Sequence, residues 1–265
     1  MTILVTGATG NIGRKVVDHL LAAGADDVRA LSNRPERAGL PSGVEVVRGF
    51  LGRVETLPAA FEGVDRMYLA PYLPTVEEVV DLARRAGVGH IVDLSGDAHW
   101  VPIARAVEKS GVDYTHLSAG EFADNSVMWA EQIREGQVRE AYPEAANAPV
   151  AMDDIARVAA AVLTQDGHAG ATYTLTGPDT ITRAERIREL GRALGREIPV
   201  ATVSEAEAVA VLAPAMGEEF ARWYVEGLAA SIDDPQRPTT TIADLTGRPA
   251  TTFAEWAAAN VDQFR

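Results

Sequence analysis

Cysteine is absent from this chain of 265 residues, and lysine occurs only twice, at Lys15 and Lys109. Without cysteine the chain can form no disulfide framework, no thiolate metal site and no cysteine nucleophile. The absence fits a reducing compartment, so we expect a cytoplasmic protein. The five histidines include no pair at the spacing of zinc ligands, so no metal site is expected.

Long apolar runs are also missing, because the longest are too short and too interrupted to span a bilayer. The first residues have the pattern of a core strand with no basic segment before it, which argues against a signal peptide. Acidic residues outnumber basic ones by 38 to 24, and the net charge is −14. Such a chain lacks the basic footprint that nucleic acids require. We therefore expect neither a membrane nor a nucleic acid as partner, and the oligomeric state stays open.

The glycine loop at residues 7–13 is the most informative local pattern that is present. A short β-branched run leads into Gly7, Gly10 and Gly13, and an amphipathic helix pattern follows. The glycines permit a tight turn, the approach of a pyrophosphate to the backbone, and close packing of helix on strand. The helix N-terminus adds free N–H groups and a partial positive charge for the phosphates. The loop therefore predicts a dinucleotide site.

Strand-like apolar runs alternate with helix-like segments through the first half of the chain. The predicted strands cover residues 3–6, 28–32, 44–48, 66–70, 90–94 and 114–117. The predicted helices cover residues 11–23, 54–62, 75–87 and 100–110. This alternation predicts an α/β fold with a doubly wound parallel sheet of the Rossmann type. Ligands of such sheets bind outside the carboxyl ends of the strands.

After residue 120 the alternation loosens, which predicts a smaller, mainly helical lobe that supplies substrate specificity. Helices are expected over 126–140, from Asp153 to about 164, from Thr182 to about 194, over 205–230 with a break at Pro214, and from about 252 onward. A strand is expected at 172–175 and a loop at 233–238. We place the dinucleotide-binding domain at residues 1–149 and the smaller lobe at 150–265, as parts of one compact unit.

The residues after the second strand indicate which dinucleotide is bound. An acidic residue there favours NAD, whereas a nearby arginine accommodates the 2′-phosphate of NADP. The strand ends in Asn33 and Arg34, Arg37 follows, and Arg14 comes directly after the glycine loop. No carboxylate stands at the strand tip, so we expect NADP(H) as the preferred cofactor, with NAD(H) as the alternative. In the other interpretation Arg34 and Arg37 form a solvated loop, and Glu36 between them cancels much of their field.

A family resemblance rests on five blocks, residues 7–14, 33–37, 117–125, 150–156 and 246–249, together with Phe253 and Trp256. These blocks resemble the NmrA-like family of atypical short-chain dehydrogenases/reductases, and the resemblance covers nearly the whole chain. It implies a Rossmann domain, NAD(P) binding and a small C-terminal substrate lobe. It does not settle catalysis, since the family includes both reductases and proteins that bind the cofactor only as a redox signal.

Two departures from the family pattern affect the expected site. Relatives usually carry Gly-Asp after the third strand, where the aspartate reaches the adenine, but this chain has Gly49, Phe50 and Leu51. Phe50 is therefore expected to pack on the base instead. The usual Leu-Arg-Pro-Gly after the sixth strand is replaced by residues 117–120, Leu-Ser-Ala-Gly.

The strand ends and the resemblance together give the candidate cofactor-binding residues. They are Gly7, Thr9, Gly10, Asn11, Ile12, Gly13, Arg14, Asn33, Arg34, Arg37, Phe50, Leu51, Ala70, Pro71 and Ser95. The candidate substrate contacts are Tyr72, Phe122, Asn125, Met128 and Trp129, and the small lobe adds Trp223 and Tyr224. An apolar, aromatic-lined pocket of this kind suits a flat conjugated substrate. The helical spacing of several of these residues also suits plain core packing.

The ordinary catalytic residues of the superfamily are only partly present. Ser95 stands where the resemblance places a catalytic serine, but no Tyr-x-x-x-Lys follows. Ser95, Asp97 and His99 lie two residues apart, and a histidine held by an aspartate can exchange protons near neutral pH. These three are the candidate catalytic residues. The alternative is that Asp97 caps a helix and His99 lies at the surface, while His116 is expected to be a core histidine.

Quinones and extended aromatic ketones need little proton catalysis, which would explain the missing tyrosine and lysine. We therefore expect an NAD(P)H-dependent oxidoreductase that acts on a small aromatic or quinone-like molecule, in the tailoring of an aromatic polyketide or another natural product. One alternative is a redox sensor that binds NAD(P) and a protein partner without turnover. A further alternative is a flavin- and metal-free monooxygenase, in which a reduced polyphenol reacts with oxygen.

Overall fold

The computed structural model describes residues 1–95 and 100–265, and these residues group into two compact units. The first unit comprises Met1–Ala119, Met152–Leu175 and Thr241–Arg248. The second unit comprises Gly120–Ala151, Thr176–Thr240 and Pro249–Arg265. Each unit is thus assembled from three segments that are distant in sequence, and a division into two domains at residue 149 stays a prediction.

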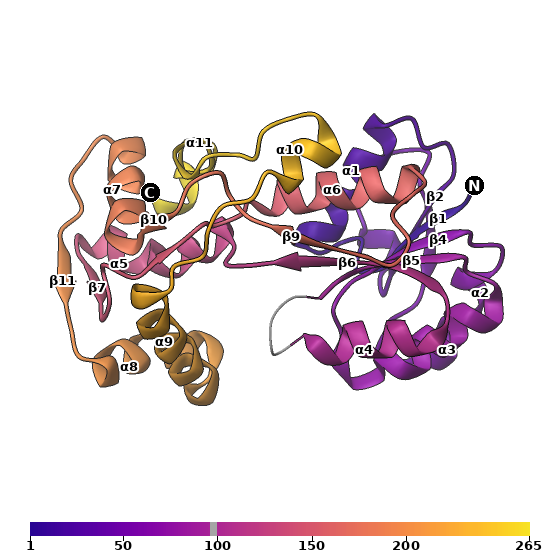
Figure 1. The fold of residues 1–265 in the computed structure, drawn as a ribbon, viewed down its shortest axis with the longest axis horizontal. Helices are drawn as coiled ribbons and strands as arrows, with labels where there is room; N and C mark the ends of the chain where they lie inside the picture. Colours follow the sequence, from indigo (N-terminus) through magenta and orange to yellow (C-terminus); the bar gives the residue numbers. More distant parts are fainter. Residues whose placement is uncertain (96–99) are drawn as a thin grey trace. The chain divides into compact units, whose positions relative to one another are not determined.

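A seven-stranded parallel sheet forms the centre of the first unit, in the order β3-β2-β1-β4-β5-β6-β9 (Figure 1). Its strands are β1 (Ile3–Val5), β2 (Val28–Ser32), β3 (Glu45–Arg48), β4 (Arg66–Leu69), β5 (His90–Leu94), β6 (Asp113–Ala119) and β9 (Ala171–Leu175). The direction of strand order reverses between β1 and β4, and ligands of doubly wound sheets bind at such a switch point. The predicted doubly wound α/β fold is confirmed.

Helices cover both faces of this sheet (Figure 1). One face carries α1 (Asn11–Ala22), α6 (Met152–Thr164) and α10 (Thr241–Thr246), and the other carries α2 (Pro58–Phe61), α3 (Val76–Ala86) and α4 (Val101–Ser110). The helices α2, α3 and α4 pack on the sheet through a core that includes Phe61, Val80 and Ile103. The predicted helix over 54–62 is shorter in the structure, because a 3-10 turn, Val54–Thr56, precedes α2 and Pro58 begins it.

The second unit is mainly helical and contains two small two-stranded sheets. Its helices are α5 (Ala130–Glu135), α7 (Arg183–Leu194), α8 (Glu205–Met216), α9 (Glu218–Asp233) and α11 (Phe253–Ala259), and 3-10 helices cover Ala123–Trp129 and Val261–Phe264. β7 (Val138–Glu140) pairs in parallel with β11 (Val200–Thr202), and β8 (Ala146–Asn147) pairs antiparallel with β10 (Ile181–Thr182). Trp129, Ile133, Trp256 and Phe264 lie in its core.

Two predicted helices of the second unit differ from the structure. The helix expected over 126–140 begins as a 3-10 helix and ends at Glu135, because Gly136 adopts φ 100° and the next residues pair as β7. The break expected at Pro214 lies instead at Gly217, and Pro214 is accommodated inside α8. The helix start at Thr182 is confirmed, since Thr182 and Glu185 form a reciprocal capping box.

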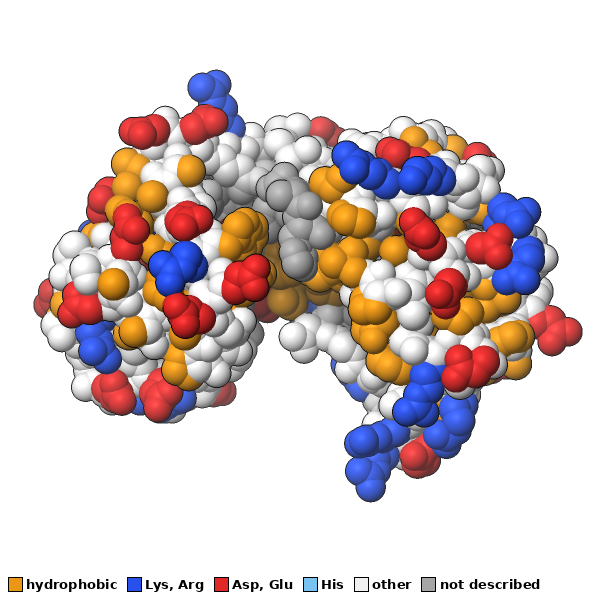
Figure 2. All heavy atoms as spheres, turned by 90° about the horizontal axis from the view of Figure 1, so that it is seen from below, with side chains coloured by type: hydrophobic (Ala, Val, Ile, Leu, Met, Phe, Trp, Pro, Cys, Tyr) orange, Lys and Arg blue, Asp and Glu red, His pale blue; other side chains and the backbone are white. Residues whose placement is uncertain are grey.

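Two surface properties bear on the expected partners. Within the described part of the chain, every helix is too short or too polar to cross a bilayer. The face drawn in Figure 2 carries basic side chains in separate groups with acidic side chains among them. That the chain binds no nucleic acid stays a prediction, for which the net charge of −14 is the argument.

Candidate cofactor and catalytic site

The turn after β1 requires glycine at two positions. Gly7 has a φ of +59°, in the left-handed region that favours glycine. A Cβ atom at Gly13 would lie 2.2 Å from the carbonyl oxygen of Gly7 and 3.0 Å from the Cα atom of Ala8. The Gly10 N–H donates to the Gly7 carbonyl at 2.8 Å, which closes the turn. The first turn of α1 therefore packs directly on the loop backbone.

The start of α1 carries an uncompensated positive end. No side chain caps the helix at Gly10, and its first turn contains no acidic residue. Thr9, Gly10 and Asn11 are exposed, so the start of this helix lies at the surface. A helix start of this kind binds phosphate through its N–H groups and its dipole. The loop thus fits the pyrophosphate of a dinucleotide, which Gly10, the second glycine of the loop, would allow to approach the backbone.

Thr6 connects the glycine loop to the neighbouring strand end. Its buried hydroxyl donates to the carbonyl of Tyr68 at 2.9 Å and accepts from the N–H of Ala70 at 2.8 Å. A Cβ atom at Gly7 would approach the Cβ of Ala70 to 2.7 Å. Ala70, and with it Pro71, therefore lies beside the glycine loop. Thr6 is a residue of the site without an expected role, although a hydroxyl at the last position of the predicted strand over 3–6 is an available signal.

The arginines after β2 are free to meet a ligand. Asn33, Arg34 and Arg37 are exposed, and neither arginine side chain has a hydrogen-bond or ion-pair partner among the described residues. The carboxylate of Glu36, which could cancel their field, is bound by Arg48 at 3.0 Å. This arrangement favours binding of a 2′-phosphate by Arg34 and Arg37.

Arg14 has a different role from these two arginines. Its guanidinium donates to the carbonyls of Ala38 and Gly39, the latter at 2.8 Å. Arg14 therefore ties the start of α1 to the loop that follows the arginines. Its expected contact with the cofactor stays a prediction.

Phe50 and Tyr72 form an aromatic corner after β3 and β4. Their rings meet edge to face, with centroids 5.5 Å apart, and Phe50 is 39% exposed. Gly52 makes room for both, because a Cβ there would lie 2.5 Å from the Phe50 ring and 2.6 Å from the Tyr72 hydroxyl. Leu51 is buried, and its carbonyl accepts from Thr75 at 2.6 Å. The structure thus pairs a predicted cofactor contact, Phe50, with a predicted substrate contact, Tyr72.

Ser95 extends β5 and has an unused hydroxyl. Its N–H donates to the carbonyl of Leu117 at 3.1 Å, and the residue is 4% exposed. Its Oγ atom has no hydrogen-bond partner within residues 1–95 and 100–265. Asp97 and His99, the other two candidate catalytic residues, lie outside the described residues. Their proposed roles stay predictions.

Asp93 and His116 form a buried pair in the same part of the sheet. The Nδ1 atom of His116 lies 2.6 Å from Oδ2 of Asp93, and its Nε2 atom lies 3.5 Å from a carboxylate oxygen of Glu108. Burial lowers the pKa of His116, but the hydrogen bond and charge of Asp93, together with Glu108, outweigh it and raise the pKa overall. Asp93 is not among the candidate residues from the sequence, although a carboxylate inside the apolar strand over 90–94 is an available signal.

The predicted substrate contacts after β6 belong to the second unit. Phe122, Asn125 and Met128 are half-buried, whereas Trp129 is only 1% exposed. The indole N–H of Trp129 donates to Glu140 at 2.7 Å, and its ring packs under a buried guanidinium. Trp129 is therefore a core residue in this structure, which was the alternative that its helical spacing allowed.

A buried ionic network surrounds Trp129. Arg183 binds Glu140 through two hydrogen bonds of 2.6 and 2.8 Å, and its guanidinium lies 4.7 Å from the centroid of the Trp129 ring. Glu121 accepts from Arg186 at 2.9 Å. Burial raises the pKa of Glu121, but the charges of Arg186 and Arg183 outweigh it and bring the pKa to about 2.

The aromatic residues of α9 divide between this network and the surface. The Tyr224 hydroxyl donates to Glu121 at 2.8 Å and accepts from Arg183 at 2.9 Å. Trp223 is instead 50% exposed, and its ring centroid lies 5.1 Å from that of exposed Phe220. Of the two α9 residues expected to contribute to substrate binding, only Trp223 therefore presents a free aromatic surface.

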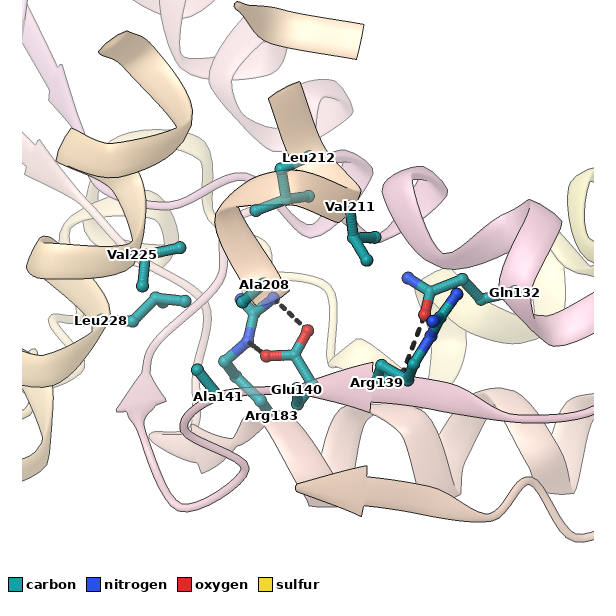
Figure 3. A pocket seen from close by; sticks show the side chains of 10 residues that line it. All are labelled: Gln132, Arg139, Glu140, Ala141, Arg183, Ala208, Val211, Leu212, Val225 and Leu228. Atoms are coloured by element: carbon teal, nitrogen blue, oxygen red, sulfur yellow. Dashed lines mark hydrogen bonds and ion pairs between the residues drawn. The ribbon is translucent and has the colours of Figure 1, made fainter. Parts of the chain in front are cut away.

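A small cavity lies beside the Glu140–Arg183 pair, under apolar side chains of α8 and α9 (Figure 3). Ala208 and Leu212 from α8 and Val225 and Leu228 from α9 line it. Its volume of about 10 Å³ is the space of a single water molecule. This cavity is too small for an aromatic substrate. No group of ligating side chains able to hold a metal ion occurs in the described ranges, and the absence of a metal stays a prediction.

Comparison with known proteins places this site in a family. A family model described as NAD(P)H-binding matches residues 7–98. The chain is 38% identical to the (4-alkanoyl-5-oxo-2,5-dihydrofuran-3-yl)methyl phosphate reductase of Streptomyces griseus, over 99% of both chains. It is 32% identical to the NAD(P)H azoreductase of Xenophilus azovorans, again over 99% of both chains.

Solved structures agree with these sequence relatives. The NADPH-dependent quinone oxidoreductase of Escherichia coli, crystallised with NADPH, is 25% identical and has a TM-score of 0.85, covering 97% of this chain and 99% of that one. The seven-stranded sheet, the glycine loop and the similarity to these reductases agree with the resemblance found in the sequence. The chain belongs to the NmrA-like group of atypical short-chain dehydrogenases/reductases and binds NAD(P)H.

Proposed function

We propose that the chain is an NAD(P)H-dependent reductase of flat aromatic or quinone-like small molecules. The observation that carries the proposal is the position of the glycine loop with Gly7 and Gly13. This loop lies at the same edge of the sheet as the Ser95 hydroxyl, which has no hydrogen-bond partner among the described residues. An azoreductase and a quinone oxidoreductase among the relatives support the substrate class. The Streptomyces relative, named as a reductase of a dihydrofuran phosphate, supports a role in secondary metabolism, of which aromatic polyketide tailoring is one case.

The residues of this chain would have separate roles in binding the cofactor and in polarising the substrate. The start of α1 holds the pyrophosphate, Arg34 and Arg37 bind the 2′-phosphate, and Phe50 stacks on the adenine. When bound, the reduced nicotinamide supplies the hydride. Ser95 donates a hydrogen bond to the substrate oxygen that gains negative charge during hydride addition. The sequence contains no Tyr-x-x-x-Lys after Ser95, and a quinone does not need one because its reduced form is a stabilised phenolate.

Quinone-dependent oxidation of NADPH tests this proposal. We expect turnover with quinones and an azo dye and none with simple aliphatic ketones, which demand a strong proton donor. Ser95→Ala should lower kcat for the quinone by about 100-fold, the lower end of the usual range for a proton-donating group. Ser42→Ala, at an exposed loop serine, is the matched control. Equal turnover by the two variants would remove Ser95 from the mechanism.

The same assay separates the two alternatives. Saturable NADPH binding without turnover of any compound in the panel would favour the redox sensor over the reductase. Oxygen uptake with an oxygenated product that forms only in air would favour the monooxygenase. Identical products with and without air would leave the reductase.

The preference for NADPH over NADH is a second test of the site. The double substitution Arg34→Ala/Arg37→Ala should raise KM for NADPH at least about tenfold, because each arginine would lose a charge-assisted hydrogen bond to the 2′-phosphate. KM for NADH, which lacks that phosphate, should change little. Arg53→Ala, at another exposed arginine, is the control. Equal effects on both cofactors would show that Arg34 and Arg37 do not read the 2′-phosphate.

A further inference from the structure

Two buried oxygen atoms without partners among the described residues belong to Asp93 in β5 and to Ser95, which directly follows this strand. Oδ1 of Asp93 and Oγ of Ser95 are both shielded from solvent, and neither has a hydrogen-bond partner among the residues described. Residues two apart on a strand point to the same face, and their Cα atoms are about 6.6 Å apart. Buried polar atoms in proteins are almost always hydrogen-bonded, directly or through water. At this spacing one water molecule can join the two oxygens.

Asp93 is held in a fixed position by its neighbours. It lies directly opposite His116 in the β5–β6 pairing, and its other oxygen accepts from the imidazole at 2.6 Å. The ring of His116 stacks on Tyr114, with centroids 4.4 Å apart, and its second nitrogen faces Glu108 of α4. Asp93 is fully buried and His116 is 3% exposed, so the carboxylate has little freedom to turn.

We propose that Asp93, fixed by His116, is a positioning residue that orients the Ser95 hydroxyl as a hydrogen-bond donor toward the substrate. A carboxylate only accepts hydrogen bonds, so a bridging water donates one hydrogen to Oδ1 of Asp93 and the other to Oγ of Ser95. The hydroxyl hydrogen of Ser95 is then left for the substrate oxygen. The inference rests on the proposed function, since it explains how Ser95 is prepared for hydride addition.

When it is protonated, the imidazole of His116 balances the charge of the buried Asp93 carboxylate. The titratable groups that face His116 are Asp93 on β5, Glu108 on α4 and Tyr114 on its own strand, while β9 brings the uncharged Thr172 opposite it. Loss of the imidazolium proton leaves the negative charge of Asp93 uncompensated beside a substrate oxygen that becomes negative. The rate of quinone reduction should therefore fall as the pH rises through the pKa of His116, which lies above its ordinary value.

A double-mutant cycle between Asp93 and Ser95 tests the proposal. Asp93→Asn keeps the size of the side chain but can turn an N–H toward Ser95. It should lower kcat for the quinone about tenfold or more in the wild-type background. In the Ser95→Ala background, Asp93→Asn should lower kcat no further, because Asp93 acts only through Ser95. KM for NADPH should change much less, and the alkaline fall in kcat should disappear in Ser95→Ala.

The possible failures are distinguishable. If the losses in activation free energy from Asp93→Asn and Ser95→Ala simply add in the double variant, and the pH profile of kcat is unaltered, Asp93 has a merely structural role. That result would overturn the inference. Absence of turnover in the wild-type protein would instead overturn the proposed function. If Asp93→Asn does not fold, as judged by thermal unfolding and NADPH binding, Asp93→Val/His116→Leu takes its place, because replacing both partners of a buried pair by apolar residues costs less than removing one charge.

Discussion

Gly13→Ala is expected to lower kcat/KM for NADPH by at least about 100-fold. The added methyl group would lie 2.2 Å from the Gly7 carbonyl oxygen and 2.6 Å from its carbon, and both are backbone atoms that cannot rotate away. The first turn of α1 must therefore move by about an ångström, and a displacement of that size in a positioning element costs about two orders of magnitude. Steady-state kinetics and direct titration with NADPH measure the loss.

The matched control is Gly227→Ala. Gly227 lies inside α9, is exposed, and has no atom within 4 Å of the position where a Cβ would be added. Alanine is favoured over glycine in a helix by up to about 1 kcal/mol, so this variant should be as stable as the parent or more so and should bind NADPH normally. A Gly13→Ala protein with unchanged NADPH affinity would contradict the assignment of the glycine loop to the pyrophosphate.

Glu140→Ala is expected to destabilise the protein by about 3–5 kcal/mol, the usual cost of removing one partner of a buried ion pair. Arg183 is 1% exposed and would lose both of its hydrogen bonds to the carboxylate, and the indole N–H of Trp129 would lose its acceptor. The charge on Arg183 would persist in the variant, because the guanidinium of an arginine stays protonated in proteins. Denaturant-induced unfolding measures the change.

Two comparisons make this result specific. Glu140→Met/Arg183→Met should be less destabilised than Glu140→Ala, because it leaves no buried charge without a partner. Glu218→Ala removes one partner of an exposed pair, Glu218 with Arg222, and should cost at most about 1 kcal/mol. If Glu140→Ala cost no more than Glu218→Ala, the network would contribute nothing to the stability of the second unit.

The fold of the first unit could be predicted because its signals are local. The run at residues 3–6, the glycines that follow and the spacing of Val16, Val17 and Leu20 each define an element within a few residues. The confirmed strand Ala171–Leu175 was also visible in its own composition. In such a sheet the carboxyl ends of the strands meet at one edge, so the region of the site followed from the strand order.

The second unit could not be predicted to the same depth, because its stabilising contacts join distant residues. Arg183 and Arg186 have the pattern of an exposed helix face, yet both are buried against Glu121, more than 60 positions earlier in the chain. The segment at 126–140 has helical spacing through Ile133, but β7 forms because β11, some 60 residues later, pairs with it. No local pattern contains that information.

The candidate site shows the same division between local and distant information. The roles of Gly7 and Gly13 follow from the loop alone, whereas the hydrogen bonds of Thr6 and the pairing of Asp93 with His116 depend on which strands are neighbours. The ion pair between Glu36 and Arg48 depends on the pairing of β2 with β3. The sequence alone therefore does not show whether Glu36 cancels the positive field of Arg34. Each of these is a contact between strands rather than a motif.

The interleaving of the two units limits how such enzymes can be recombined. Each unit consists of three stretches of chain, and the edge strand β9 and helix α6 of the sheet come from the middle stretch of the first unit. A chimera that exchanged everything after a single crossover would replace that strand and helix together with the second unit. Exchange of the second unit alone therefore requires grafting three separate inserts, with their junctions near residues 119, 151, 175, 240 and 248.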